Sequence, residues 1–352
     1  MKKMRNTAVV VLFMAMATVS CVSQTGAIST ARAVNDPAPQ WMNDLDSVYP
    51  DSQYIAAVGT GDTRRDAESD ASGSVARRFN VDIKADTQAQ KRYHEVVSNE
   101  KSYNESDVSI VDKVSSSANE QLKDLKFSDP YVDAKGQVNI VAYLDRNSVA
   151  NLYRTVITKD KSVIDSLRIR ADSASSALVG FAILDSAVVI SMNSDRLISQ
   201  LQIISPATAK VLASQVDTQS LIAKRDAFAQ KLGYTISIDG DTDGKVAGII
   251  RKALGTLKIP YNAKGNLQVQ GTVSMESVEV NPQFKSVRWT LTVGLMDETG
   301  ASIANFFKES RENAISDPEA RAFAIKSIEK GINKDFLESL NSYLAKAGQS
   351  GN

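Results

Sequence analysis

The sequence predicts an α+β protein in which two small units, each a sheet with helices packed on it, are joined by a long helical segment. Strand patterns occur near residues 54–58 and 132–146 and again from 267 onward, whereas the stretch 147–232 has helical spacing almost throughout. The composition, 43% hydrophobic and 6% aromatic in 352 residues, is typical of a globular protein with about two or three domains. The predicted folded parts are residues 39–153, 154–232 and 233–346, followed by a tail at 347–352.

The chain begins with the three-part layout of a bacterial export signal. Basic residues occupy positions 2, 3 and 5, residues 7–19 carry no charge and are mostly apolar, and small residues precede position 21. A membrane-spanning helix needs about 20 apolar residues, and this run is shorter. We therefore expect residues 1–20 to be a signal peptide that is removed.

Cys21 is the only cysteine of the chain, and it directly follows the small residue Ser20, as the cysteine of a lipoprotein signal does. An exported chain with one cysteine can form no internal disulfide, and a thioether bond to diacylglycerol removes the reactive thiol. We predict cleavage between Ser20 and Cys21 and lipidation of Cys21 with chains such as palmitate, which anchors the protein to a membrane. Thr18 stands where the usual motif has Leu, so ordinary secretory cleavage near Ala17 is the alternative.

The residues after this cysteine indicate where the protein goes. Val22 stands where an Asp would favour retention in the inner membrane, so we expect anchoring to the outer membrane, on its periplasmic face or at the cell surface. Residues 22–39 are small and polar and have two prolines at their end, which predicts a flexible tether over residues 21–38. Without the three basic residues of the signal peptide, 38 Lys and Arg remain against 41 Asp and Glu. This balance does not favour nucleic acid as a partner.

The first folded unit begins with a strand at 54–58, a glycine turn, and a helix that Thr63 and Asp66 cap. Spacing of four residues gives this helix one apolar face, formed by Ala67, Ala71, Val75, Phe79 and Ile83. A second amphipathic pattern consists of Val111, Val114, Ala118, Leu122 and Leu125. A hairpin that turns at Gly136 closes the unit, which predicts helices on a small sheet.

Together these residues resemble a known family of bacterial envelope proteins. A Pro-x-Trp start, a Tyr-x-x-x-Val-Gly-x-Gly strand and turn, an alanine-spaced helix and a closing Ala-Tyr-Leu-Asp-Arg strand are similar to the lipoprotein family named for a twenty-kilodalton outer-membrane lipoprotein. A similar domain forms the N-terminal part of the flagellar assembly protein called T. The resemblance covers about residues 39–153, implies an envelope lipoprotein without known enzymatic activity, and supplies no catalytic residue. The matching residues are Pro39, Trp41, Tyr54, Val58, Gly59, Gly61, Ala67, Ala71, Tyr143, Leu144, Asp145 and Arg146.

The middle of the chain predicts one long helix with one or two shorter partners folded against it. Ser205 and Pro206 restart the helical pattern as an N-cap and a first turn, and Gly233 is placed to end it. Residues 177–190 are apolar enough to raise the question of a membrane span. They are too few to cross a bilayer and include Asp185, so we expect a buried helix face.

The second sheet unit is predicted in the order strand, helix, three strands, helix, which echoes the first unit and suggests a diverged repeat. Half-buried strands are indicated by alternating Leu267, Val269, Gly271 and Val273, and by alternating Val287, Trp289, Leu291, Val293 and Leu295. Ser316 with Glu319 predicts a capping box. The helix behind it is expected to bury Ala320, Phe323, Ile328, Ile332, Phe336 and Leu340.

Candidate catalytic residues are scarce. His94 is the sole histidine and lies in a polar stretch, so no His/Cys zinc site can be assembled, and a Ser-His-Asp triad would depend on this residue. Gly59 and Gly61 precede a helix without the third glycine of a dinucleotide fingerprint, which indicates a tight turn. We expect no enzymatic activity and no cofactor.

Asp239, Asp241 and Asp243 match the opening of an EF-hand calcium loop. Ile250 occupies the twelfth loop position, where a bidentate Glu is needed. The residues favour a turn whose Asp243 caps the following helix, with calcium binding by the three aspartates as the alternative.

The sequence therefore indicates an exported, lipid-anchored envelope protein that acts without catalysis as a binding, scaffold or assembly factor, with other envelope proteins as partners. The resemblance implies an envelope or flagellar structure as the assembly. A protein from another class is the alternative, namely a carrier for a small apolar ligand held between the second sheet and its helices. A cavity at that sheet distinguishes the two, because large side chains without a cavity would exclude the carrier.

Overall fold

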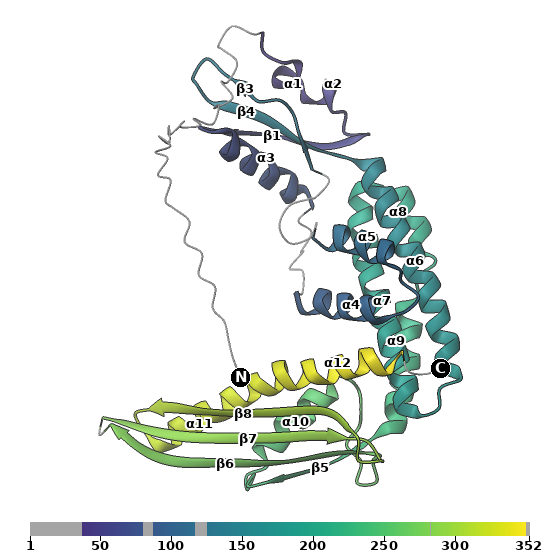
Figure 1. The fold of residues 1–352 in the computed structure, drawn as a ribbon. Coiled ribbons are helices and arrows are strands. Elements are labelled where there is room, and N and C mark those ends of the chain that lie inside the picture. Colours follow the sequence, from purple (N-terminus) through teal and green to yellow (C-terminus); the bar gives the residue numbers. More distant parts are fainter. Residues whose placement is uncertain (1–36, 80–86, 117–124, 282, 350–352) are drawn as a thin grey trace, which may run out of the picture.

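The computed structural model describes residues 37–79, 87–116, 125–281 and 283–349. An N-terminal sheet unit and a C-terminal sheet unit lie at the two ends of a helical spine, and together they form a curved body (Figure 1). The predicted α+β class is confirmed. The predicted signal peptide and Cys21 lie outside the described residues.

The N-terminal sheet is antiparallel and is built around its last strand. The strands are β1 (Tyr54–Gly61), β2 (Lys126–Phe127), β3 (Tyr131–Val132) and β4 (Val138–Asp145). β4 pairs with β1 along one edge and with β2 and β3 along the other. The predicted hairpin between β3 and β4 is present and turns at Gly136, whose φ is +81°. On one face of the sheet, Trp41 from the short helix α1 (Gln40–Asn43) packs with Ala56 and Val141.

The helix α3 (Arg64–Phe79) packs closely on this sheet. Thr63 caps it as predicted, because its hydroxyl oxygen accepts a hydrogen bond from the N–H of Asp66 (3.2 Å). The predicted face is fully buried at Ala67, Ala71 and Val75. Gly59 permits the close approach, since a Cβ there would lie 2.2 Å from the main-chain nitrogen of Ala71.

Two further helices, α4 (Thr87–Asn99) and α5 (Glu105–Ser116), pack on the spine. The second predicted helical pattern is wrong at its end, because Leu125 lies beside β2 and not in a helix. Val111 is buried in α5 as predicted. The remaining predicted side chains of these patterns fall outside the described parts, namely Phe79, Ile83, Val114, Ala118 and Leu122.

The spine contains two long antiparallel helices where the sequence predicted one. Its helices are α6 (Arg146–Asp172), α7 (Ala177–Ile204), α8 (Pro206–Ala213) and α9 (Thr218–Leu232). By length and composition alone α7 could cross a membrane, with a mean hydropathy of 1.6 over its most apolar window. However, 78% of that window is buried inside the protein, so the prediction of a buried helix is confirmed although the helix is longer than expected. Ser205 and Gly233 occupy the N-cap of α8 and the C-cap of α9 as predicted, although the Ser205 side chain makes no capping hydrogen bond.

The C-terminal unit has the predicted order of elements. These are β5 (Tyr234–Asp239), α10 (Lys245–Gly255), β6 (Leu267–Asn281), β7 (Phe284–Met296), β8 (Ser302–Ala314), α11 (Asp317–Gly331), the π-helical turn η1 (Ile332–Phe336) and α12 (Leu337–Ala347). The strand order is β5-β6-β7-β8, with β5 parallel to β6 and the other pairs antiparallel. The alternating residues of β7 are buried on one face, from Val287 to Leu295.

Two details of the predicted last helix are wrong. Ser316 occupies the N-cap position, but its side chain makes no capping hydrogen bond. The neighbouring Asp317 contacts the side chains of Ser277 and Arg321. Phe323 is 37% exposed, whereas the other predicted core residues of this helix are buried. The buried stripe of this helix is formed by Ala320, Ala324 and Ile328, spaced by four residues, and Phe323 lies beside it.

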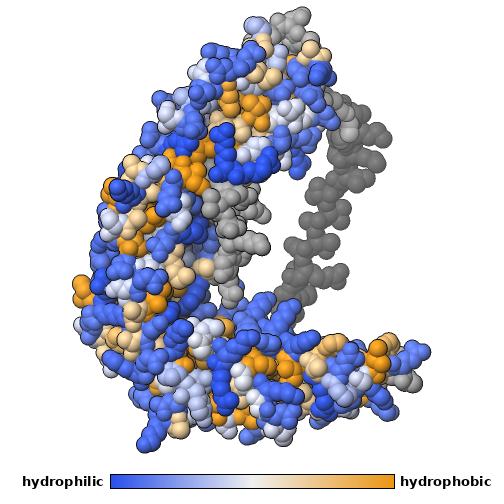
Figure 2. All heavy atoms as spheres, turned by 180° about the vertical axis from the view of Figure 1, so that it is seen from behind, coloured by the Kyte–Doolittle hydropathy of each residue, from blue (hydrophilic) through white to orange (hydrophobic). Residues whose placement is uncertain are grey.

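Helix α12 connects the C-terminal unit to the spine and to α4 through direct contacts. It packs on α7 and α4, and Lys91 of α4 forms an ion pair with Glu338. Arg170 of α6 donates a hydrogen bond to the carbonyl of Gly348, just beyond α12. Figure 2 shows the opposite face of the molecule, where hydrophobic residues form small groups on a mostly hydrophilic surface.

Candidate functional site

The residues considered for catalysis and for the calcium alternative do not gather into a site in the described parts of the chain. His94 contacts Asp112 across α4 and α5, with 3.3 Å between Nδ1 and the carboxylate oxygen, and its side chain is 35% exposed. Within the described ranges, no group of three or more His, Cys, Asp or Glu side chains is arranged to hold a metal ion. Ser20 and Cys21 lie outside those ranges.

The aspartate loop before α10 caps the helix, but with a different residue from the predicted one. The two carboxylate oxygens of Asp241 accept hydrogen bonds from the N–H groups of Val246 (3.1 Å) and Ala247 (2.8 Å). Asp243 instead pairs with Lys245 (3.0 Å) at the surface. The prediction that Asp243 caps the helix is therefore wrong, because the chain turns at positive φ just before the helix and brings Asp241 under the first turn.

A groove of about 370 Å³ lies beside this loop, bounded by β6 and by the first half of α11. Its walls combine apolar and charged side chains with glycine main chain. The lining residues are Gly240, Asp241, Thr242, Asp243, Lys245, Val273, Met275, Pro318, Arg321, Ala322 and Ile325. The volume is near the lower end of the ~300–1,000 Å³ of ligand sites.

The groove exists because β5 is much shorter than the strand beside it. β5 pairs with β6 only from Leu267 to Thr272, and β6 then continues to Asn281. The loop leaves β5 at Gly240, which has φ +83° and lies so close to β6 that a Cβ would be 2.1 Å from the carbonyl oxygen of Val273. The sequence pattern did not predict this difference in strand length or its consequence for the sheet edge.

Arg321 spans the groove from α11 to β6. Its Nη1 donates to the carbonyl oxygen of Met275 (3.3 Å), and its Nη2 donates to the hydroxyl of Ser277 (3.2 Å). Its Nε donates to the carboxylate of Asp317 (2.8 Å). Hydrogen bonds from Ser277 and from Arg321 lower the pKa of Asp317, so this carboxylate stays charged beside the guanidinium.

The space between the C-terminal sheet and its helices is otherwise filled by large side chains. Trp289 and Phe336 are fully buried there, and Phe306 is 4% exposed. In Figure 1 the strands lie in front of α10 and α11, which cover this packed face. The groove is therefore an edge feature of the unit and not an internal apolar chamber.

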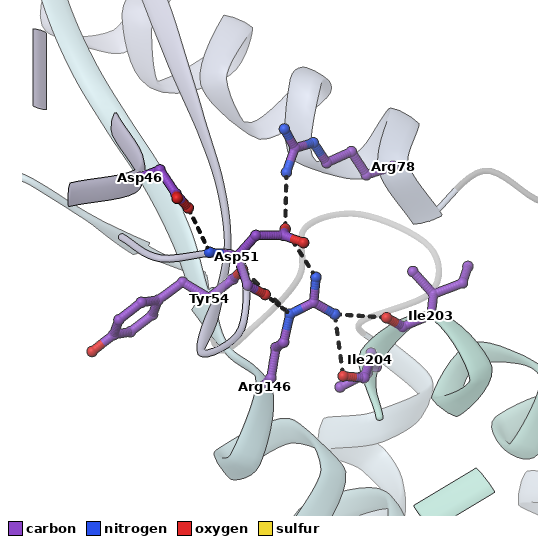
Figure 3. A network of polar contacts seen from close by, with 7 residues as sticks. All are labelled: Asp46, Asp51, Tyr54, Arg78, Arg146, Ile203 and Ile204. Carbon is purple, nitrogen blue, oxygen red and sulfur yellow. Dashed lines mark hydrogen bonds and ion pairs between the residues drawn. The ribbon is translucent and has the colours of Figure 1, made fainter. Parts of the chain in front are cut away.

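A second polar site joins the N-terminal unit to the spine, at the first residue of α6 (Figure 3). Nη1 of Arg146 donates to the carbonyl oxygens of Ile203 (2.6 Å) and Ile204 (3.1 Å) at the end of α7. Nε donates to the carbonyl oxygen of Asp51 (2.7 Å), and Nη2 contacts the Asp51 carboxylate (3.1 Å). We call this set the Arg146 joint. It explains physically why an arginine closes the motif at the end of β4.

A third polar cluster is buried where α4 packs on the spine. The carboxylate of Asp160 accepts hydrogen bonds from the hydroxyls of Tyr103 (2.8 Å), Tyr93 (3.0 Å) and Ser194 (2.9 Å). Burial raises the pKa of Asp160 to about 6, against the opposing effect of these hydrogen bonds. Sequence reasoning missed this residue, although a lone aspartate on an apolar helix face was a signal that it needed buried partners.

No family model matches the chain. No curated protein matches it either. Among solved structures it is similar to a minor lipoprotein from Acinetobacter baumannii, with 13% identity over 31% of this chain and 91% of that one and a TM-score of 0.25. It is similar to a secreted protein from Helicobacter pylori, with 12% identity over 82% and 97% of the two chains and a TM-score of 0.37.

A candidate lipoprotein from Caulobacter crescentus has 14% identity over 35% of this chain and 95% of that one, with a TM-score of 0.23. These neighbours carry the names of lipoproteins and of a secreted protein, which is the class that the sequence resemblance leads us to expect. At these identities and scores the similarities establish neither a family nor a function for this chain.

Proposed function

We propose that this chain is an exported envelope lipoprotein, anchored to the outer membrane through Cys21, that acts without catalysis by binding other envelope proteins as a scaffold or assembly factor. The export pattern of residues 1–20 and the lone cysteine support export and lipid anchoring. The resemblance of residues 39–153 to an envelope lipoprotein family and to a flagellar assembly domain supports the assembly role, with an envelope or flagellar structure as its setting.

The groove beside β6 is the observation that favours a protein partner. It presents main-chain groups of Val273 and Met275 together with side chains of both charges. Such groups can form hydrogen bonds and ion pairs with a polypeptide. A carrier for a small apolar ligand would need an enclosed apolar cavity at the C-terminal sheet, and Trp289 and Phe336 fill that position.

Photo-crosslinking in living cells tests the proposal. A photoreactive amino acid is placed at Ala322 in the groove and, as a matched control, at Ile169, which is 70% exposed on the spine. We expect an adduct with an envelope protein from position 322 and a much weaker one from position 169. Absence of any protein adduct from the groove, in cells that contain the chain in the membrane fraction, would count against a scaffold role.

A further inference from the structure

We infer that the groove binds an extended polypeptide segment, which adds as a new strand to the open edge of β6 beyond the end of β5. The inference rests on the proposed function, because it specifies what a protein partner presents to this chain. It uses features of the β6 edge that neither the sequence resemblance nor the similar structures assign.

The edge of β6 is open over a length that a short peptide can cover. β5 pairs with β6 as far as Thr272, and in the described parts of the chain no strand pairs with the same side of β6 from Val273 onward. On its other side β6 pairs with β7 through Val278, so this part of the strand is held in the sheet. An open edge of this kind is a template for an added strand.

Two observations show which main-chain groups face that edge. The carbonyl of Val273 lies against Gly240 of the loop, and the carbonyl of Met275 accepts a hydrogen bond from Arg321. The N–H and C=O of one strand residue point to the same edge, and alternate residues share that edge. The main chains of Val273, Met275 and Ser277 therefore face the groove, at the spacing that a strand ladder requires.

In the unbound protein Arg321 occupies part of this edge. One of its three donor contacts is the hydrogen bond to the Met275 carbonyl, while its Nε remains on Asp317. Natural proteins protect open sheet edges with charged side chains. An incoming peptide N–H can replace the Arg321 donor at Met275, after which the guanidinium keeps its carboxylate partner.

The walls of the groove define the side chains of the segment. A strand beside β6 directs alternate side chains toward the helices, where Met275, Ala322 and Ile325 form an apolar wall. The other side chains face solvent. The charged lining residues, two aspartates, one lysine and one arginine, sum to zero, so a strongly charged segment is not favoured. The ligand class is thus an uncharged segment of alternating apolar and polar residues.

The probe is a library of short random peptides displayed on phage and selected against the full chain purified in detergent. We expect selected peptides to alternate apolar and polar residues. Binding should slow hydrogen exchange at the amides of Met275 and Ser277, and N-methylation of alternate peptide amides should weaken binding by about tenfold or more, because it removes the ladder donors.

Two matched proline variants locate the binding edge. Met275→Pro removes an N–H that faces the groove and should weaken peptide binding by about tenfold or more. Glu309→Pro is the matched control at the other edge of the same sheet, on β8. The N–H of Asn305 donates to Ser339 and not to β7, so the main chain of Asn305 faces the outer edge of the sheet. The N–H of Glu309, four residues further along β8, faces the same outer edge, because alternate strand residues share an edge. We expect Glu309→Pro to change peptide affinity by less than about twofold.

The inference is overturned if selection yields no peptide, or if Glu309→Pro abolishes binding while Met275→Pro does not. Full affinity of the N-methylated peptides would also overturn it, because the peptides would then bind through their side chains alone. The N-methylation experiment remains a valid test even if Met275→Pro fails to fold.

The same experiments distinguish failure of the strand-addition site from failure of the proposed function. Envelope adducts in cells without peptide binding at β6 would leave the scaffold role in place and remove the strand-addition site. Peptide binding at β6 by a chain that is absent from the envelope would support that site and overturn the envelope role.

Discussion

Replacement of Arg146 by Met should weaken the contact between the N-terminal unit and the spine and so lower the free energy of unfolding. The substitution keeps an unbranched apolar stem and removes every donor of the Arg146 joint. The carbonyls of Ile203, Ile204 and Asp51 lose hydrogen bonds of 2.6, 3.1 and 2.7 Å from a charged donor. The arginine side chain is only 17% exposed, so water replaces these bonds incompletely.

The magnitude follows from those contacts. A hydrogen bond to a charged group contributes about 1.5–3 kcal/mol, and breaking a buried charged network costs about 3–5 kcal/mol. The ion pair with Asp51 adds little, because the aspartate side chain is 72% exposed. The cation also lies at the C-terminal end of α7, where the helix dipole favours positive charge. We expect Arg146→Met to lower the free energy of unfolding by about 3–5 kcal/mol.

Urea unfolding followed by circular dichroism measures this change, with Arg154→Met as the matched control. Arg154 lies on the same helix and contacts Asn151 and Thr208 at the surface, so its loss should cost less than about 1 kcal/mol. Equal effects of the two substitutions, or a cost below about 1 kcal/mol for Arg146→Met, would refute the reasoning.

Three further predictions concern stability. The pKa of Asp160 is about 6 in the folded protein and 3.8 ordinarily, so its contribution to stability is present below about pH 4 and lost as the pH rises through 6. Asp160→Asn should remove this pH dependence of the urea unfolding midpoint between pH 4.5 and 8. An unchanged pH dependence in the variant would contradict this. Gly59→Ala should destabilise by more than about 2 kcal/mol because its Cβ would meet main chain at 2.2 Å, whereas Gly73→Ala, with its nearest neighbour at 3.6 Å, should be neutral or stabilising. Asp241→Ala should cost about 1 kcal/mol as a lost cap, equally with and without millimolar calcium, and a calcium-dependent melting temperature would point instead to the EF-hand alternative.

Local patterns in the sequence predicted the elements whose structure depends on near neighbours. Alternation along β7 and the four-residue spacing of α3 each identified a buried face, since a strand or helix repeats its direction every two or about four residues. The N-cap at Thr63 followed from the same local rules. The predicted glycine turn is wrong, because Gly59 and Gly61 lie inside β1 and pair with Ile140 and Val138 of β4. The Asp-Arg end of β4 was recognised only as part of a motif.

The rest depends on contacts between distant parts of the chain. Arg146 finds its partners at the end of α7, and Asp160 finds Tyr93 and Tyr103 on a segment that leaves the first unit to pack on the spine. The groove beside β6 arises from the relative lengths of two strands separated in sequence by α10. The assignment of the cap to Asp243 failed because it assumed that the nearest aspartate caps the helix, whereas the turn places Asp241 there.

The mass and lipid content of the mature N-terminus test the central claim, that this is a lipid-anchored envelope protein, most directly. If Cys21 is the first mature residue, its peptide should carry the added mass of glycerol and acyl chains, and labelled palmitate should be incorporated into the chain. Cys21→Ser should abolish both, because a hydroxyl forms no thioether, and should release the protein from the membrane fraction. A mature N-terminus downstream of Cys21, with no lipid on the chain, would contradict the account.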